Sequence, residues 1–174
     1  MKPVYHKPVL LDESTGSLII DPGCVYIDAT SDGGVDSGSF LKRLDAIRRL
    51  LSFDQDEETI QNNGIRDERF GLFHQNFRYM QNVLRLHHIS VVSGILSDLG
   101  VSWHQFDIPN RGFSTRFDHR FDMQMNCYVH SSVLQVVGQY LEEVLIEIFP
   151  IYGELKGAKK NCTKKCRKTC RETH

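Results

Sequence analysis

The stretch from Gly94 to Asn126 constrains the fold of this chain more than any other part of the sequence. It opens with the apolar run GILS at residues 94–97, which predicts a buried strand, and this strand ends at Asp98 before a turn at Gly100. An apolar strand that ends in an acid and a glycine delivers a carboxylate to the carboxyl edge of a sheet, where open α/β folds bind their ligands. The sequence therefore predicts an α/β fold with a ligand site beside Asp98.

The residues after this strand combine aromatic, arginine and aspartate side chains. Aromatic rings beside arginines suit a flat base next to a phosphate. The alternative, which the composition leaves open, is a lid that packs its aromatic rings on the sheet. The residues concerned are Trp103, Phe106, Phe113, Phe117, Arg111, Arg116, Arg120, Asp118 and Asp122.

Two motifs in this stretch, DLGVSWHQFD at 98–107 and RGFSTRFDHRFDMQMN at 111–126, resemble the signature of the MraW-type (RsmH) methyltransferases. Members of that family use S-adenosylmethionine to methylate cytosine N4 in small-subunit (16S) ribosomal RNA. The resemblance begins at YHKPVLLDES and covers residues 5 to about 158, roughly the first half of a family member. It implies an α/β fold of the Rossmann-like (class I) methyltransferase type, a three-layer sandwich that is C-terminally truncated and has at least four strands.

The order of strands and helices agrees with such a fold. A glycine loop between the first strand and a helix is the usual nucleotide-cofactor arrangement, although a double glycine alone also fits a plain turn. Asp54 ends the second strand about 20 residues beyond this loop, where an acid can accept hydrogen bonds from ribose hydroxyls. Residues 131–149 predict one amphipathic helix that Pro150 ends. The expected strands are Val25–Thr30, Leu50–Asp54, Phe70–His74 and Val91–Ser97, and the expected glycine loop is Ser31–Ser37.

The resemblance also assigns the site. It gives Asp98 a catalytic role, and we hypothesise that this carboxylate accepts the N–H groups of the cytosine amine and so turns the nitrogen lone pair toward the methyl group. Arg111 and Arg116, with the lysines of the tail, are expected to contact phosphate; the alternative for each is a solvated charge. No metal site is expected. The cofactor-binding residues that the resemblance implies are Gly34, Val35, Asp36, Asp54, Phe77, Asp98 and Gln105.

Three features depart from the family pattern. Asp32, Val35 and Asp36 occupy two glycine places and the histidine place of the loop, and valine strongly disfavours a positive φ. Trp103 stands beside the expected cofactor pocket, where a small serine is usual. The family's inserted helical domain and later strands have no counterpart, so strand four is expected to be an uncovered edge.

The chain of 174 residues, with 40% hydrophobic and 25% charged residues, suits one soluble globular domain. It contains no apolar run long enough to cross a membrane and no N-terminal leader, which makes the cytoplasm the expected location. The net charge of −1 hides an asymmetry, because residues 156–174 carry +7 and residues 1–155 carry −8. We therefore expect an incomplete methyltransferase domain at 1–155 and a frayed basic tail at 156–174. Cys162, Cys166 and Cys170 in this tail are too few for an ordinary structural zinc site.

The predicted function is S-adenosylmethionine-dependent methylation of cytosine N4 in small-subunit ribosomal RNA, with that RNA or the 30S particle as partner. The alternative is a non-catalytic RNA- or protein-binding remnant of the same family, and a fragment without independent function is a third possibility. The open edge of strand four also suggests association of copies of this chain.

Overall fold

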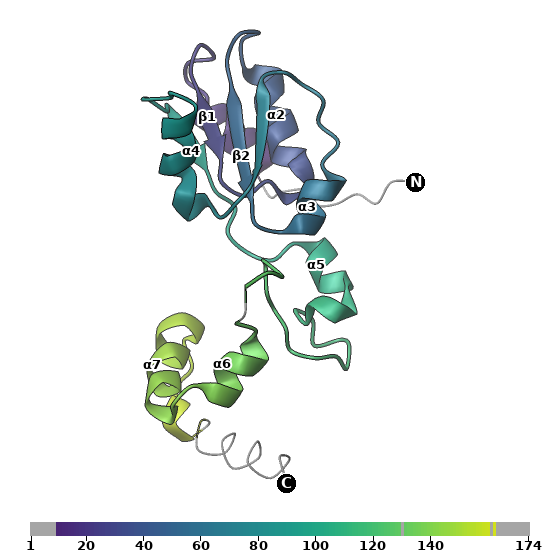
Figure 1. Ribbon diagram of the computed structural model, residues 1–174, viewed down its shortest axis with the longest axis vertical. Coiled ribbons are helices and arrows are strands. Elements are labelled where there is room, and N and C mark those ends of the chain that lie inside the picture. The colour runs from purple at the N-terminus through teal and green to yellow at the C-terminus, as the bar shows by residue number, and fades with distance from the viewer. Residues whose placement is uncertain (1–9, 130, 161, 163–174) are drawn as a thin grey trace. The chain divides into compact units, whose positions relative to one another are not determined.

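The computed structural model describes residues 10–129, 131–160 and 162, and of Val35 only the backbone. The chain divides into two compact units (Figure 1). The first runs through Ile108 and also includes Met125–Tyr128, and the second holds Pro109–Gln124 and the chain from Val129 onward. The expected boundary between a domain at 1–155 and a tail at 156–174 stays a prediction.

The first unit is built around a parallel four-stranded sheet in the order β3-β2-β1-β4 (Figure 1). In the central strand, Ile27 lies opposite Leu51 on one side and Ile95 on the other. The strands are β1 (Tyr26–Asp28), β2 (Leu50–Asp54), β3 (Phe70–His74) and β4 (Gly94–Leu96). The predicted second and third strands have the bounds of β2 and β3, whereas β1 and β4 are shorter than predicted.

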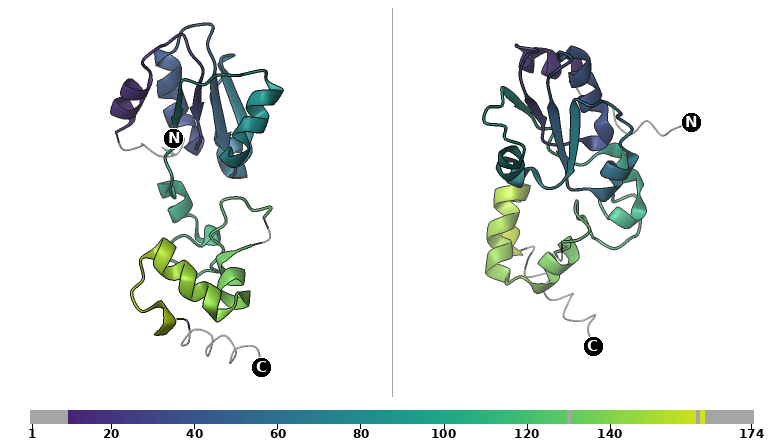
Figure 2. Two further views of the ribbon diagram at one scale, coloured as in Figure 1. Left: turned by 90° about the vertical axis from the view of Figure 1, so that its left-hand side faces the viewer. Right: turned by 45° about the horizontal axis from the view of Figure 1, so that its top comes forward.

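Helices cover both faces of this sheet. Figure 2 (left) shows the strands between α1 and α2 on one side and α4 on the other. The helices and 3-10 turns of this unit are α1 (Leu11–Leu18), η1 (Asp32–Gly34), α2 (Val35–Arg43), α3 (Glu57–Asn62), η2 (Phe77–Tyr79), α4 (Met80–Leu86) and α5 (Trp103–Asp107).

The two faces of the sheet have separate cores because successive strand side chains point to opposite sides. Tyr26 and Leu50 pack with Phe40, Leu41 and Leu44 on the side of α2. Their chain neighbours in the strands join the other core, which comprises Ile27, Ala29, Leu51, Phe53 and Val83 and lies on the side of α4. A parallel sheet covered on both faces needs apolar residues at consecutive positions, as these strands have. The predicted three-layer, Rossmann-like α/β architecture is thus confirmed.

The fourth strand is not the buried strand that its apolar sequence predicts. Within the described part of the chain, β4 pairs only with β1, and the side chain of Ile95 is 50% exposed. The prediction of burial was wrong because it used local composition, whereas the burial of a strand depends on the elements that cover it. The prediction that this strand lies at an edge of the sheet is confirmed.

The second unit contains η3 (Pro109–Arg111), α6 (Val133–Gln139) and α7 (Glu142–Gly153). The single helix predicted for residues 131–149 is therefore wrong: Tyr140 is extended, with ψ 144°, and separates α6 from α7. Gly138, which helices disfavour, lies just before the break. Pro150 does not end the helix as predicted but lies inside α7, which continues to Gly153. The fixed φ of proline suits a helix, although its missing N–H removes one hydrogen bond from the ladder.

The beginning of the predicted tail is packed rather than frayed. Ala158 and Cys162 are both buried, at 4% and 1% exposure, so the expectation of a frayed tail was wrong at these positions. Cys166 and Cys170 lie outside the described residues. No helix in the part of the chain that the structure describes has the length and apolar character needed to cross a membrane.

Candidate functional site

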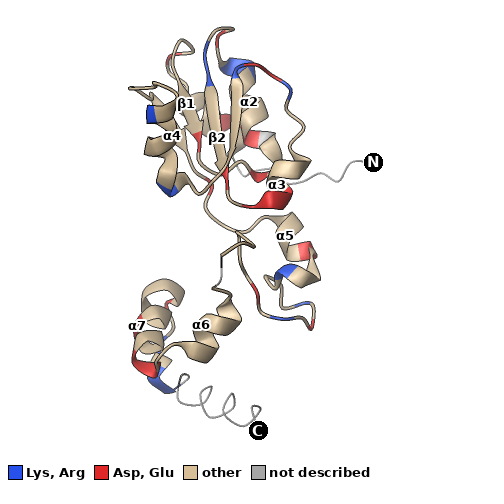
Figure 3. Cartoon of the chain, viewed as in Figure 1, with Lys and Arg blue, Asp and Glu red and all other residues tan. Residues whose placement is uncertain are grey.

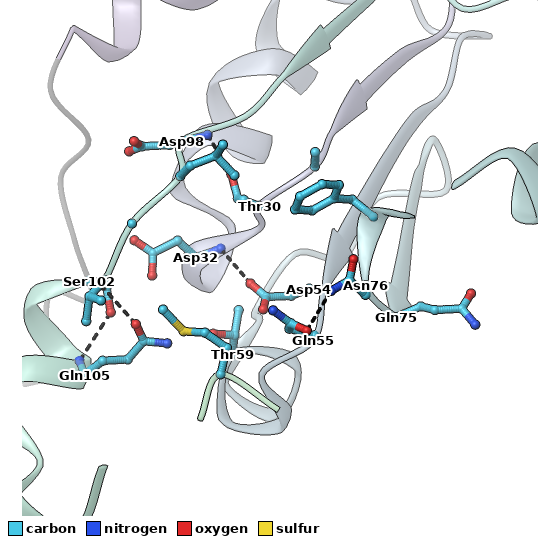
Figure 4. Close-up of a pocket in the computed structure, with 16 residues that line it drawn as sticks. Thr30, Asp32, Asp54, Gln55, Thr59, Gln75, Asn76, Asp98, Ser102 and Gln105 are labelled. Carbon is cyan, nitrogen blue, oxygen red and sulfur yellow. Dashed lines mark hydrogen bonds between the residues drawn. The ribbon is translucent and has the colours of Figure 1, made fainter. Parts of the chain in front are cut away.

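A pocket of about 370 Å³ lies in the first unit, where β1, β2 and β4 end (Figure 4). Parallel strands bring their carboxyl ends to one edge of a sheet, so polar residues that follow different strands meet there. Three of the lining residues are carboxylates and, among the described residues, none that line it is basic. The lining consists of Ala29, Thr30, Asp32, Asp54, Gln55, Thr59, Gln75, Asn76, Phe77, Asp98, Leu99, Gly100, Val101, Ser102, Gln105 and Met125.

The carboxylate of Asp54 holds the loop after β1 and the residue that caps α3. Its Oδ2 accepts a hydrogen bond from the backbone N–H of Asp32 (3.2 Å), and its Oδ1 accepts one from the N–H of Asp56 (2.9 Å). Burial raises the pKa of Asp54 above its ordinary value, against the effect of these two hydrogen bonds. Each carboxylate oxygen can accept a further hydrogen bond, so Asp54 can hold the loop after β1 and also bind a hydroxyl in the pocket.

The loop after β1 turns through three residues with positive φ: Asp32 (33°), Gly33 (77°) and Gly34 (87°). A Cβ on Gly34 would lie 2.7 Å from Nδ2 of Asn63, so the residue must be glycine for both its conformation and its close contact. Val35 then begins α2. The backbone of Val35 is therefore helical, and the valine does not need the positive φ that its residue type disfavours.

Asp98 is exposed at the mouth of the pocket, and its backbone is tied to β1. Its N–H donates to Oγ1 of Thr30 (2.8 Å), and the N–H of Thr30 donates to Oδ1 of Asp28 (3.2 Å). Asp28 is fully buried at the end of β1 and accepts hydrogen bonds at Oδ2 from the hydroxyls of Ser37 (2.6 Å) and Ser52 (3.2 Å). This chain of hydrogen bonds fixes the position of Asp98 relative to the sheet.

Gln105 lines the pocket, but its amide already has partners. Its Nε2 donates to Oδ2 of Asp56 (2.7 Å), and its Oε1 accepts from the N–H of Ser102 (3.0 Å) in a capping box that starts α5. Asp56 itself caps α3 by accepting from the N–H of Glu58. Gln105 therefore joins α5 to α3 and shapes the wall of the pocket.

The residues that the sequence assigned to the cofactor divide into two groups. Asp54, Phe77, Asp98 and Gln105 come together around the pocket. Gly34 and Asp36 are buried and do not line it. Trp103, expected beside the pocket, is also outside the lining, and its side chain is 68% exposed. Its chain neighbour Ser102 does line the pocket, so the expectation that Trp103 stands beside the pocket stays a prediction.

The two arginines predicted to bind RNA lie in the second unit, each against an aromatic ring. The guanidinium of Arg111 is 5.7 Å from the ring centre of Phe113, and one of its N–H groups donates to the carbonyl of Gln124 (3.0 Å). Arg116 is exposed, with its guanidinium 5.5 Å from the ring centre of Phe117. The fold of this segment depends on Gly112, because a Cβ there would lie 2.5 Å from the carbonyl oxygen of Arg120.

The sequence of the chain matches the model of a known protein family. Residues 3–173 match the model of the MraW methylase family. The chain belongs to the MraW methylase family. The match extends somewhat further at both ends than the region of residues 5 to about 158 that the motifs indicated.

Individual members of the family are also similar to this chain. The chain is 52% identical over 114 residues to the ribosomal RNA small subunit methyltransferase H of Flavobacterium johnsoniae, a match covering 66% of this chain and 37% of the relative. It is 50% identical over 117 residues to the protein of the same name from Phocaeicola vulgatus, covering 67% and 38%. The chain thus matches well under half of the length of these curated relatives.

Three residues that line this pocket, Asp32, Asn76 and Met125, are not among the site residues predicted from the sequence. Asp32 was noticed only as a departure from the family glycine, yet it lines the pocket. Asn76, which donates to Oε1 of Gln55 (2.8 Å), and Met125 also line it. Asn76 could have been predicted as a pocket residue because it directly precedes Phe77. Met125 could not, because no local sequence pattern indicates that this residue belongs to the first unit.

Proposed function

We propose that this chain binds S-adenosylmethionine in the pocket at the ends of β1, β2 and β4 and methylates cytosine N4 in small-subunit ribosomal RNA. The observation that carries the proposal is the assembly of Asp54, Phe77 and Asp98 around one pocket in a chain of the MraW family. The relatives are named as methyltransferases of small-subunit ribosomal RNA, and the choice of cytosine N4 rests on the sequence resemblance.

The residues of the pocket fit this cofactor. A volume of about 370 Å³ lies within the usual range for small-molecule sites. Asp54 offers carboxylate oxygens for ribose hydroxyls, and Phe77 offers a ring for adenine. The remaining carboxylates, Asp32 and Asp98, favour a ligand with positive charge.

S-adenosylmethionine would supply a methyl group on a sulfonium sulfur. As the amine nitrogen bonds to the methyl carbon, the bond from that carbon to sulfur breaks, the neutral thioether leaves, and the nitrogen gives up one proton to solvent. The protein must then position the two ligands and shape the charge around them. Asp98 is suited to hold an exocyclic amine, because its backbone is fixed to Thr30 while its carboxylate is exposed at the mouth. By accepting an N–H of the amine, this carboxylate would orient the nitrogen lone pair toward the methyl group.

Replacement of Asp98 by alanine is expected to reduce turnover about ten- to a hundredfold at saturating cofactor, since it removes an oriented acceptor. The measurement is transfer of a radioactive methyl group from S-adenosylmethionine to small-subunit particles, with mapping of the modified base. Glu13→Gln, which removes an exposed acid of α1, serves as the control for charge. Turnover by Asp98→Ala equal to that of the unmodified chain would exclude this role, and a folded unmodified chain that binds cofactor but transfers no methyl group would contradict the proposed reaction.

A second candidate function is RNA or protein binding without catalysis. It is supported by the two arginine–aromatic pairs of the second unit, since such pairs offer both a phosphate contact and a stacking surface. Figure 3 shows basic and acidic residues interspersed along the loop that follows α5.

Arg116→Ala is expected to weaken binding of a fluorescent small-subunit RNA fragment about three- to tenfold and to reduce the dependence of binding on salt, because one phosphate contact is lost. Arg116 suits this test better than Arg111, whose hydrogen bond to Gln124 contributes to the fold. Fluorescence anisotropy at several salt concentrations measures both quantities. RNA binding by a chain that binds no cofactor would favour this second function, and an unchanged salt dependence would exclude the phosphate contact.

The expected association of copies of the chain and its expected cellular location stay predictions. Association of copies of the chain would use the free edge of β4, and cytoplasmic location follows from the proposed ribosomal substrate.

A further inference from the structure

Asp32 contributes one of the three carboxylates that line the pocket. Its carboxylate and that of Asp98 point the same way, and Asp54, Gln55 and Asn76 lie on the other side (Figure 4). The carboxylates of Asp32 and Asp98 therefore lie toward one side of the pocket, and the carboxylate of Asp54 lies with the amides of Gln55 and Asn76 toward the other. An elongated ligand with a nucleoside at one end and a net positive charge on the part joined to it fits this division.

The position of Asp32 is fixed by the backbone around it. Its N–H donates to Asp54 (3.2 Å), the N–H of Ser31 donates to the carbonyl of Phe53 (3.0 Å), and the N–H of Gly34 donates to the carbonyl of Ser31 (2.6 Å). With φ at 33°, Asp32 has a conformation that aspartate and asparagine adopt more readily than other side chains. The loop thus presents a carboxylate to the pocket at a place where the family pattern has a glycine without a side chain.

We propose that Asp32 makes this pocket selective for the cationic form of the cofactor, S-adenosylmethionine, over the neutral product S-adenosylhomocysteine. The inference rests on the proposed function. At neutral pH the sulfonium cofactor carries one net positive charge, and the thioether left after methyl transfer carries none. Attraction to the carboxylates of Asp32 and Asp98 is therefore lost when the methyl group leaves. Asp32 in this way strengthens binding of the substrate form and promotes release of the product.

The test compares three ligands by calorimetry on the full chain: S-adenosylmethionine, S-adenosylhomocysteine and 5′-methylthioadenosine, which lacks the amino-acid end. Asp32→Asn keeps the side-chain shape and tolerates the same backbone but removes the charge. We expect this variant to reduce the preference for S-adenosylmethionine over S-adenosylhomocysteine about tenfold and to leave the affinity for 5′-methylthioadenosine unchanged. Glu13→Gln, in which the lost charge is remote from the pocket, should leave all three affinities unchanged.

The outcomes separate this inference from the proposed function. If Asp32→Asn binds all three nucleosides with the ratios of the unmodified chain, the selectivity proposal falls and cofactor binding stands. If the variant weakens 5′-methylthioadenosine as much as the other two, Asp32 acts through the shape of the loop and the proposal also falls. If the folded, unmodified chain binds none of the three, both the proposed function and the selectivity are overturned.

Discussion

Asp54→Ala is expected to weaken binding of S-adenosylmethionine about a hundredfold. The carboxylate lines the pocket at the end of β2, where it can accept hydrogen bonds from ribose hydroxyls while holding the N–H groups of Asp32 and Asp56. Hydrogen bonds to a charged group contribute about 1.5–3 kcal/mol each, and the loss of one or two gives an effect of this size. Calorimetric titration of the folded variant measures it.

Asp54→Asn is the matched variant for this experiment, because it keeps the size of the side chain and one acceptor oxygen. Its affinity should lie between those of the alanine variant and the unmodified chain. Thermal unfolding of each variant checks that the chain still folds when one or both of these backbone hydrogen bonds are lost. An alanine variant that is folded and binds the cofactor with unchanged affinity would exclude Asp54 from the site.

The ionisation of Asp54 adds a dependence on pH to the same prediction. Burial raises the pKa of this carboxyl above its ordinary value. If the ionised form accepts the ribose hydroxyls, the affinity for S-adenosylmethionine should rise with pH through that raised pKa and level off above it. The comparison of the unmodified chain with Asp54→Asn over the acidic range isolates this effect, since the asparagine does not titrate.

Asp28→Asn is expected to change how the stability of the first unit depends on pH. Burial raises the pKa of Asp28 to about 7 from an ordinary value of 3.8; the hydrogen bond from Ser37 opposes this shift, and the nearby carboxylate of Asp36 adds to it. Because the pKa is higher in the folded chain, folding favours the protonated acid. The stability that this group contributes is fully present below pH 3.8 and is lost as the pH rises through about 7.

Each unit of pKa difference corresponds to about 1.4 kcal/mol, so Asp28 should lower the free energy of unfolding by about 3 kcal/mol between pH 5 and pH 8. Asparagine is neutral throughout and can still accept the N–H of Thr30. Urea unfolding of both proteins at these two pH values should therefore show that the variant gains about this amount relative to the unmodified chain at pH 8. Parallel stability curves for the two proteins would show that Asp28 has no raised pKa in the folded chain.

A stability change at Asp28 should also reach the pocket, because this residue holds Thr30, and Thr30 holds Asp98. The hydrogen bonds from Ser37 and Ser52 connect the same carboxylate to α2 and β2. Asp28 thus connects α2 and β2 to Thr30, the residue that positions Asp98.

The elements that the sequence predicted best are those whose signals are local. The strands Leu50–Asp54 and Phe70–His74 are short apolar runs between turn residues, and their bounds in the structure are the predicted ones. The capping of α5 is also local, since Ser102 and Gln105 stand three residues apart. The helix predicted for residues 131–149 failed because apolar spacing continues across Tyr140, where the backbone is extended.

By itself the sequence determined the parallel sheet and the meeting of Asp54 and Asp98, because residues that end parallel strands share one edge. The resemblance carried by its motifs gave the family and added Phe77. Only the tertiary structure decided the burial of Asp28, the commitment of the Gln105 amide to Asp56 and the presence of Asp32 in the pocket. It also decided that Ile95 is exposed. The physical reason is the same in each case: burial and hydrogen-bond partners are set by segments distant in the sequence, and no local pattern of residues records them.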